Sequence, residues 1–564
     1  MARTVGIGIQ DFSKIRENNY FYIDKTHFIK EWWESGDDTT LITRPRRFGK
    51  TLNMSMLEAF FSVDYSERSD LFEGLSIWEE EKYRNLQGTY PVISLSFARI
   101  KEDNYIAAKE KICEILRGAY IKFSFLMQRD VLTEADKNYF NQVLEMDMKE
   151  TVASSALYQL SDFLHRYYGK KVIILLDEYD TPMQEAYTHG FWNELVAFTR
   201  NLFNSTFKTN PFMERGIMTG ITRVSRESIF SDLNHLKVVT PTSDDYATAF
   251  GFTEEEVFAA LEEYSLENEK EKVKFWYDGF IFGEHKDIYN PWSILNFLDT
   301  GKFNIYWANT SSNSLVSKLI REGDGQVKNA FEELLKGEHI RCSIDEQIVY
   351  NRLSGSETAI WSLLVASGYL KIIDYEALDT VGTRQPLYEL ALTNFEVECM
   401  FHNMVRDWFE GVKPMYNNFI EAMLTGDIDA MNDYMNEITV DVFSYFDTEA
   451  KNMRSASEKF YHGFVLGLLV NLRDRFHITS NRESGFGRYD VMLEPKRKED
   501  NAVIMEFKAF NGRREKTLED TLENALLQIE NKKYEALLIS RGVDTERIYK
   551  YGIVFEGKKV LIGR

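Results

Sequence analysis

A short apolar run followed by two acids is the feature that most constrains the fold of this chain. Val172–Leu176 reads VIILL, and Asp177 and Glu178 follow it directly. A run of this length and apolarity is typical of a strand in a parallel sheet that is buried on both faces. Such sheets belong to α/β folds, in which helices cover both faces of the sheet.

Strand and helix patterns alternate along the first part of the chain. Further strands are predicted at Thr39–Thr43, Val92–Phe97, Gly216–Thr219 and Leu236–Val239. Helices are predicted at Thr51–Phe61 and Trp192–Lys208, with several more within residues 105–168. Strands that alternate with helices in this way indicate an α/β parallel sheet.

The loop between the first predicted strand and helix, residues 44–51, reads RPRRFGKT. Its last three residues, Gly49, Lys50 and Thr51, end it as a Walker A loop ends. In such a loop, backbone N–H groups and a helix N-terminus cradle phosphates. Lys50 would then reach the β- and γ-phosphates of ATP, and the Thr51 hydroxyl would bind Mg²⁺.

Three arginines of this loop need interpretations of their own. Arg44 stands where the first glycine of a Walker A loop usually lies. Arg46 and Arg47 could add positive charge at the phosphates, or they could pair with acidic neighbours. The sequence leaves these two interpretations open.

The acids after the apolar run would supply the second half of an ATP site. Asp177 would hold the Mg²⁺ shell, and Glu178 would orient or activate the attacking water. One predicted strand, Val92–Phe97, lies between the loop and these acids, as in the P-loop class with an added strand and a catalytic glutamate. The alternative is a buried strand that ends in acids at a turn.

A third strand of this region ends at Thr219. In the same P-loop class, a small polar residue at this place senses the γ-phosphate. We therefore expect Thr219 to do so, with Thr222 and Arg223 as second choices. A plain turn is the alternative.

Six segments together resemble the predicted AAA-type ATPase family of bacteria. They are residues 22–26 (YIDKT), 44–51 (RPRRFGKT), 176–182 (LDEYDTP), 230–234 (FSDLN), 250–253 (FGFT) and 289–293 (YNPWS). The resemblance covers roughly residues 5–300, and the arginine-rich loop is normal in that family. It implies an ATPase core at residues 1–250, followed by a helical or winged-helix lid region at 251–385. The aromatic rings of Trp276 and Trp292 are then expected in the core of the lid region.

A carboxylate–lysine group lies near the end of the chain. Strands are predicted at Tyr489–Leu493 and Val503–Phe507, and together they form a hairpin. Glu506 and Lys508 share one face of their strand, because residues two apart point the same way, and Asp490 at the start of the partner strand can meet them. Two carboxylates suit Mg²⁺, and Lys508 could position or activate a water that the metal acidifies.

This arrangement is the pattern of the PD-(D/E)XK nuclease superfamily. Glu458 could add a third metal carboxylate, and Gln528 could meet the metal-bound water or the substrate. A helix-capping Glu458 and a solvated Gln528 are the alternatives. Residues 386–564 also resemble the nuclease-like domain that commonly follows this ATPase family, and Asp490, Glu506 and Lys508 match its motif residue by residue.

Charge and composition limit the partners. The net charge is −22, but from Asn471 onward 19 Lys and Arg face 16 Asp and Glu, against 48 and 73 in the remainder. The mildly basic end permits contact with nucleic-acid phosphates, and an ordinary solvated surface is the alternative. The three cysteines are far apart, which excludes a disulfide framework and a multi-cysteine zinc site.

No apolar stretch is long enough to span a membrane, and residues 1–15 have no apolar signal core. A cytoplasmic protein is therefore expected, with homo-oligomers allowed. The leading hypothesis is an ATPase coupled to a metal-dependent nuclease that acts on DNA or RNA, with ATP and Mg²⁺ as cofactors. The alternative is a nucleotide-switched binding protein whose nuclease-like domain only grips nucleic acid or protein. A toxin-like or defence role is compatible with either.

Overall fold

The computed structural model divides the chain into two compact units, Met1–Leu315 with His339–Glu398, and Val316–Glu338 with Cys399–Arg564. The predicted boundaries at residues 250 and 385 stay predictions. The residues that the structure describes are 2–146, 148–223, 230, 233, 235–308, 314–323, 325–346, 353, 356–376, 386–407, 413–443, 472, 475–480, 483–484, 487–497, 499–510, 515–556 and 559–564.

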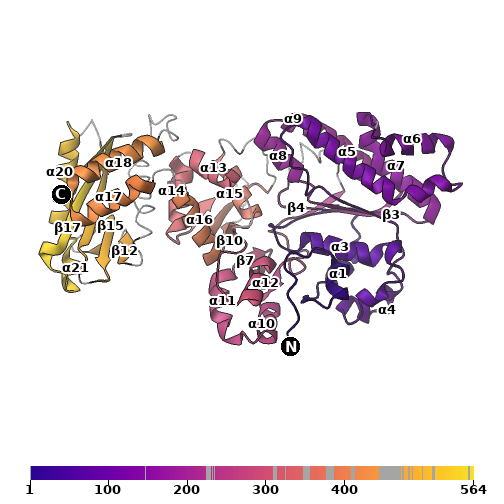
Figure 1. Ribbon diagram of the computed structural model, residues 1–564, viewed down its shortest axis with the longest axis horizontal. Coiled ribbons are helices and arrows are strands. Elements are labelled where there is room, and N and C mark those ends of the chain that lie inside the picture. The colour runs from indigo at the N-terminus through magenta and orange to yellow at the C-terminus, as the bar shows by residue number, and fades with distance from the viewer. Residues whose placement is uncertain are drawn as a thin grey trace. The chain divides into compact units, whose positions relative to one another are not determined.

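A five-stranded parallel sheet forms the centre of the first unit (Figure 1), in the order β2-β3-β4-β1-β5. The strands are β1 (Thr39–Thr43), β2 (Val92–Ser96), β3 (Val172–Asp177), β4 (Met213–Gly220) and β5 (Leu236–Val239). Every residue of β3 is buried, as its apolar sequence predicts. The predicted α/β parallel sheet is confirmed, and each predicted strand lies within a few residues of its observed bounds.

Helices cover both faces of this sheet, with α5, α7 and α9 on one face and α1 and α3 on the other (Figure 1). The helices of this part are α1 (Phe12–Glu17), α2 (His27–Glu34), α3 (Lys50–Phe61), α4 (Glu81–Arg84), α5 (Tyr105–Lys122), α6 (Glu134–Leu144), α7 (Glu150–Tyr168), α8 (Thr181–His189) and α9 (Trp192–Phe207). Some helix ends have a clear local cause: Asn104 accepts from the Ala107 N–H to start α5, and Gly169 ends α7 in the left-handed region.

The register of the sheet brings chemistry-bearing residues to one edge. Ile42 pairs with Thr219 between β1 and β4, and Ser96 pairs with Asp177 between β2 and β3. The Tyr179 N–H continues the ladder by donating to the carbonyl of Thr219, at 3.0 Å. Because the strands are parallel, their carboxyl ends meet at the same edge, where α/β sheets bind ligands.

The rest of the first unit combines helices with short antiparallel strands. A three-stranded sheet β6-β8-β7 comprises β6 (Phe252–Thr253), β7 (Phe280–Phe282) and β8 (His285–Tyr289), beside α10 (Glu254–Glu263), α11 (Lys270–Tyr277) and α12 (Pro291–Thr300). A second sheet, β10-β11-β9, comprises β9 (Ile340–Cys342), β10 (Leu370–Glu376) and β11 (Leu387–Leu392), near α15 (Glu357–Ala366) in sequence. The sequence did not predict these strands, because strands of two to seven residues carry little periodicity.

The second unit contains a mixed five-stranded sheet, in the order β12-β15-β16-β17-β18. Its strands are β12 (Phe476–Ser480), β15 (Val491–Pro495), β16 (Ala502–Ala509), β17 (Ile548–Glu556) and β18 (Lys559–Gly563). Only the β16–β17 pair is parallel among these neighbours. The predicted hairpin is confirmed as β15 and β16, which pair antiparallel.

The two faces of this sheet carry different apolar clusters. Val503, Met505 and Phe507 of β16 pack with residues of α17 (Lys413–Thr425) and α18 (Ile428–Phe443). Ala502 and Ile504 pack on the other face with residues of α20 (Leu518–Lys532) and α21 (Ala536–Ser540). The remaining elements are α13 (Ser314–Glu322), α14 (Gly325–Leu335), α16 (Phe395–Asp407), β13 (Glu483–Ser484) and β14 (Gly487–Arg488). Across the described residues, no helix is long and apolar enough to cross a membrane.

Candidate nucleotide site and candidate nuclease centre

Arg44 occupies the first position of the loop between β1 and α3, and it is fully buried. Its guanidinium donates to the carbonyls of Thr43, Thr240 and Asp245, at 3.0, 2.7 and 3.1 Å. Its backbone N–H extends the β1 ladder to the carbonyl of Gly220. The Arg44 side chain therefore fixes the loop to the turn after β5, and a glycine at this position could not form these hydrogen bonds.

The loop then turns sharply into α3. Arg47 and Gly49 both adopt left-handed backbone conformations, with φ of 65° and 80°. Gly49 is the N-cap of α3 and has no side chain with which to cap it. The first N–H groups of the helix are thus left for an anion, which the helix dipole also favours.

The Lys50 side chain is folded back into the loop. It is 5% exposed, and its ammonium donates to the carbonyls of Arg44 and Pro45, at 2.9 and 2.8 Å. Burial lowers the pKa of Lys50, while the charges of Glu178 and Asp177 oppose that change. The ammonium is therefore held beside both the loop and the acids after β3.

Two predicted site residues, Thr51 and Thr219, converge on the carboxylate of a third, Asp177. The hydroxyl of Thr51 donates to Asp177 Oδ2 at 2.7 Å, and the hydroxyl of Thr219 donates to Asp177 Oδ1. Burial raises the pKa of Asp177, and the two hydroxyls oppose this effect. The oxygens come from α3, β3 and β4, so the sheet register itself assembles an oxygen-rich group of the kind that Mg²⁺ prefers.

Glu178 lies one residue further, at the turn after β3. Its φ of 52° is left-handed, a conformation that costs a non-glycine residue about 1–2 kcal/mol. Its N–H donates to Thr219 Oγ1 at 3.4 Å, and its carboxylate accepts from the hydroxyl of Thr181 at 3.1 Å. The turn thereby places the Glu178 carboxylate in the wall of a cavity.

Thr222, one of the two second-choice residues, lies at a neighbouring acid instead. Asp180 accepts hydrogen bonds from the N–H of Ile221 and from both the N–H and the hydroxyl of Thr222, at 2.8–3.0 Å. Burial raises the pKa of Asp180, and these hydrogen bonds oppose it. Thr222 therefore holds Asp180, whereas Thr219 contacts Asp177.

Arg46 and Arg47 both line the same cavity. Arg46 Nη2 donates to the amide oxygen of Gln184 at 3.2 Å, and the Arg47 guanidinium lies 4.2 Å from the ring centroid of Trp292. Arg46 thus contacts an amide, and Arg47 contacts an aromatic ring. Trp292 lines the cavity, so the expectation that it lies in the core was wrong; Trp276 packs against the apolar cluster of α10–α12 as expected.

The cavity has a volume of about 580 Å³ and extends well beyond the loop. Its walls include residues of the N-terminal segment, among them Gly8, Ile9 and Phe21, and Phe252 just before α10. This size is within the range of small-ligand sites. Sequence motifs alone did not identify these apolar walls, because no local pattern marks them.

The second centre lies in the other unit, on the β15–β16 hairpin. Asp490 Oδ2 accepts a hydrogen bond from the N–H of Phe507 at 2.8 Å. Lys508 Nζ lies 3.5 Å from Glu506 Oε1, and Glu506 is only 2% exposed. Phe507 belongs to the opposite apolar face, as the alternation of β16 requires.

Gln528 of α20 completes this group. Its amide donates to Glu506 Oε1 and, at 3.1 Å, to the hydroxyl of Tyr534. Burial raises the pKa of Tyr534, and the charges of Glu506 and Asp490 raise it further. Gln528 is therefore a partner of Glu506 rather than a solvated side chain, and Tyr534 is a member of the group that the sequence did not reveal.

The third carboxylate predicted here, Glu458, lies outside the described residues. Among the residues that are described, no group of three or more His, Cys, Asp and Glu side chains is arranged to hold a metal ion. Asp490 and Glu506 nonetheless supply carboxylate oxygens beside a lysine, which is a donor set that suits a hard divalent cation. Two carboxylates fit such an ion as part of its shell.

The parallel sheet, the loop before α3 and the Asp177 cluster give the first unit a P-loop NTPase-like fold, and the hairpin with α20 gives the second unit a nuclease-like fold. Residues 6–230 match the family described as predicted AAA-ATPase, and residues 456–564 match the PD-(D/E)XK nuclease superfamily. The chain therefore combines an AAA-ATPase-like domain with a PD-(D/E)XK nuclease-like domain.

One relative is similar to this protein over most of the chain. It is a protein of Azotobacter chroococcum mcd 1 described as "Uncharacterized protein in vnfD 5'region", and it is 26% identical over 396 residues. The match covers 70% of this chain and 68% of the relative. The similarity therefore extends beyond the ATPase-like domain, although the description of the relative states no activity.

Proposed function

We propose that the first unit binds and hydrolyses Mg-ATP. The observation that carries this proposal is the contact of Thr51 and Thr219 with the two oxygens of Asp177, beside the buried Lys50. Lys50 would bind the β- and γ-phosphates, and Thr51 and Asp177 would hold Mg²⁺, which neutralises developing phosphate charge when bound. Glu178 would accept a proton from the attacking water, and Thr219 would respond to the γ-phosphate.

We further propose that the C-terminal domain cleaves nucleic-acid phosphodiesters with a divalent metal. The support is the group formed by Asp490, Glu506, Lys508 and Gln528. Asp490 and Glu506 would hold the ion, which lowers the pKa of a bound water when present. Lys508 would position that water, and Gln528 would orient Glu506.

One assay tests both proposals. Purified protein would be incubated with plasmid DNA and, separately, with RNA, with Mg²⁺ or Mn²⁺ and with or without ATP, while phosphate release is followed. Cleavage that requires the metal supports the nuclease. Binding of nucleic acid without cleavage would favour the alternative, a nucleotide-switched binding module with an inactive nuclease-like domain.

A cytoplasmic location and homo-oligomers also remain proposals. Cys113, Cys342 and Cys399 take part in no disulfide bond, and such thiols are typical of proteins in a reducing compartment. Size-exclusion chromatography with light scattering, with and without Mg-ATP, would measure the oligomeric state.

A further inference from the structure

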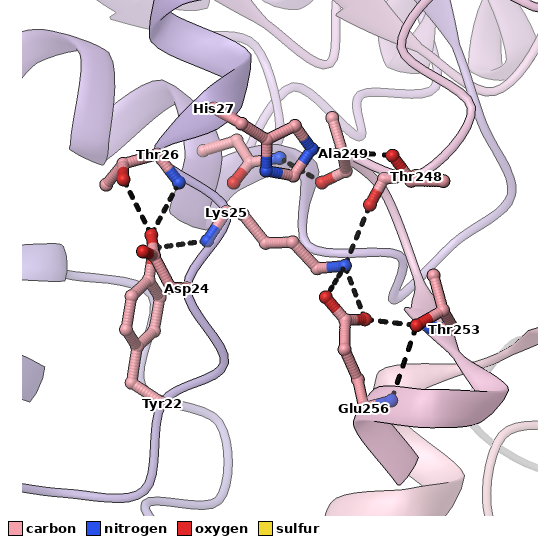
Figure 2. Close-up of polar contacts among 10 residues, drawn as sticks. Tyr22, Asp24, Lys25, Thr26, His27, Thr248, Ala249, Thr253 and Glu256 are labelled. Atoms are coloured by element: carbon pink, nitrogen blue, oxygen red, sulfur yellow. Dashed lines mark hydrogen bonds and ion pairs between the residues drawn. The ribbon is translucent and has the colours of Figure 1, made fainter. Parts of the chain in front are cut away.

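Lys25 forms a buried ion pair that the proposed ATP chemistry does not use. Its ammonium donates to Glu256 Oε1 and Oε2 at 2.7 and 2.6 Å, and to the carbonyl of Thr248 at 2.7 Å (Figure 2). The Lys25 side chain is only 6% exposed, against 25% for that of Glu256. An ammonium has three donors, so these three contacts use all of them.

Glu256 also starts helix α10. Its Oε2 accepts from the N–H of Thr253 at 2.8 Å, while the Thr253 hydroxyl accepts from the N–H of Glu256 at 3.3 Å (Figure 2). This is a capping box. One carboxylate thus holds both the Lys25 ammonium and the first turn of α10.

The backbone around Lys25 is fixed independently. Asp24 accepts from the N–H and the hydroxyl of Thr26, at 2.8 and 2.6 Å, and from the N–H of Ser76 at 2.7 Å. The Lys25 N–H donates to the hydroxyl of Tyr22 at 3.3 Å. The backbone position of Lys25 is therefore fixed by contacts that do not involve Glu256.

The ion pair joins two walls of the nucleotide cavity. Ile23 and Lys25 line the cavity from the N-terminal segment, and Ala249 and Phe252 line it from the segment before α10. That second segment is also tied to the P-loop helix, because Asn53 of α3 donates to the carbonyl of Ala249 at 2.9 Å. A ligand in the cavity would therefore contact both of the segments that Lys25 and Glu256 hold together.

The wall before α10 is tightly packed against the P-loop. Gly251 has a left-handed φ of 88°, and a Cβ there would lie 2.6 Å from Ile288 and 3.1 Å from Phe48 of the loop. A displacement of the loop on nucleotide binding thus reaches this segment directly, since interiors transmit strain.

We propose that Lys25 and Glu256 couple nucleotide occupancy of the cavity to the first turn of α10, with Lys25 as a positioning residue. This inference rests on the proposed binding of Mg-ATP. A nucleotide that contacts both walls stabilises the conformation in which Lys25 and Glu256 form their ion pair. Because Glu256 is also part of the capping box, the ion pair in turn stabilises the first turn of α10. Because coupling is reciprocal, breaking the pair weakens nucleotide binding by the factor by which nucleotide stabilises the α10 start.

Glu256→Gln is the informative variant. Gln keeps an oxygen that can accept from the Thr253 N–H, so the capping box survives, while the charge that holds Lys25 is lost. Glu254→Gln is the matched control: Glu254 lies in the same first turn, and its carboxylate contacts Lys274 and Tyr289 instead of Lys25. Lys25→Met combined with Glu256→Gln removes both charges, so that no lone charge is left buried.

The experiment measures amide hydrogen exchange in α10 with and without Mg-ATP, and Mg-ATP affinity by calorimetry. In the wild type and in Glu254→Gln, nucleotide should slow exchange in the first turn of α10 by about tenfold, a typical coupling factor. In Glu256→Gln and in the double variant, affinity should fall by about tenfold and the nucleotide-dependent protection should disappear.

Wild-type protection and affinity in both of these variants would overturn the coupling. If Glu256→Gln does not fold, the double variant alone decides between the same two outcomes. A wild-type protein that shows no Mg-ATP binding in calorimetry would overturn the proposed function, and the coupling with it. Binding with no protection of α10 would overturn the coupling alone.

Discussion

The side-chain amide of Gln528 donates a hydrogen bond to the carboxylate of Glu506. Gln528 lies on α20 and Glu506 on β16, so this contact joins the helix to the strand that carries the proposed metal ligand. A partner of this kind fixes the orientation of a metal-binding carboxylate. The relationship gives Gln528 a defined role in the nuclease centre, which mutation can test.

Gln528→Ala should reduce metal-dependent cleavage by about 10- to 100-fold, because Glu506 loses the donor that orients it. Asn524→Ala is the control, since Asn524 lies one turn earlier on α20 and donates to Glu515, away from Glu506. Cleavage rates of the two variants on the same substrate are the measurement. Cleavage by Gln528→Ala at the same rate as by Asn524→Ala and the wild type would show that Gln528 does not act through Glu506.

Lys508→Ala should abolish cleavage while sparing metal binding, because Lys508 positions water and does not hold the ion. Asp490→Asn should lose both, since an amide is a poor ligand for a hard cation in place of a carboxylate. Calorimetry with Mn²⁺ and a plasmid assay separate the two effects. Lys550→Ala serves as the control, because Lys550 lies on the neighbouring strand β17 and pairs with Glu530. Cleavage by Lys508→Ala at the wild-type rate would remove lysine from the mechanism.

Lys50→Ala should weaken Mg-ATP binding by more than about 100-fold, as expected for loss of a charged contact to phosphate in a buried site. Titration calorimetry measures this change. Lys30→Ala, which removes a surface pair with Glu80, should bind Mg-ATP as the wild type does. Unchanged affinity in Lys50→Ala would mean that the loop does not bind the phosphates.

Glu178→Gln should still bind Mg-ATP but release phosphate at least about 100-fold more slowly, because it keeps the shape of the side chain and loses the base. Glu185→Gln is a close control, since Glu185 lines the same cavity from α8. Full turnover by Glu178→Gln would place the base elsewhere. Asp180 is the next acid in the chain, although its hydrogen bonds to Ile221 and Thr222 give it a structural role.

Stability of the first unit should fall as pH rises towards neutrality. Burial raises the pKa of Glu396 to about 7, against its hydrogen bonds from the Ser293 hydroxyl and the Trp307 N–H. Between the unfolded pKa near 4.5 and the folded value, the folded state holds a proton that the unfolded state has lost. The free energy of unfolding therefore decreases through this window, by up to about 3 kcal/mol, and levels off above it.

Thermal unfolding of the wild type and of Glu396→Gln, followed from pH 4.5 to pH 8, isolates this contribution. The variant should lack the part of the pH dependence that Glu396 causes, so the two melting temperatures should converge or cross within the window. Parallel profiles would show that Glu396 titrates alike in the folded and unfolded states.

Local patterns predicted those parts of the molecule whose causes are local. The run Val172–Leu176 is apolar without interruption and lies in β3, which ends at Asp177. Glu506 and Lys508 share a face through the two-residue period of a strand. The capping box at Thr253 formed as its sequence indicates.

Contacts between distant residues were beyond such patterns. The Lys25–Glu256 pair joins residues 231 positions apart, and nothing near Lys25 indicates its partner. Tyr534 enters the nuclease centre through a turn after α20, and Trp292 enters the cavity through the Asn290 cap of α12. The strand β10 was not predicted, because its sequence, LKIIDYE, has apolar and charged residues in no regular alternation.

The buried guanidinium of Arg44 changes what the ordinary P-loop pattern means for this chain. Two of its three hydrogen bonds to carbonyl groups, those to Thr240 and Asp245, tie the loop to residues about two hundred positions away in sequence. Replacing Arg44 with the common glycine would restore the familiar motif and remove the tether. A closer match to the Walker A consensus would therefore not make this loop a better phosphate site. Engineering the loop towards that consensus would destabilise it.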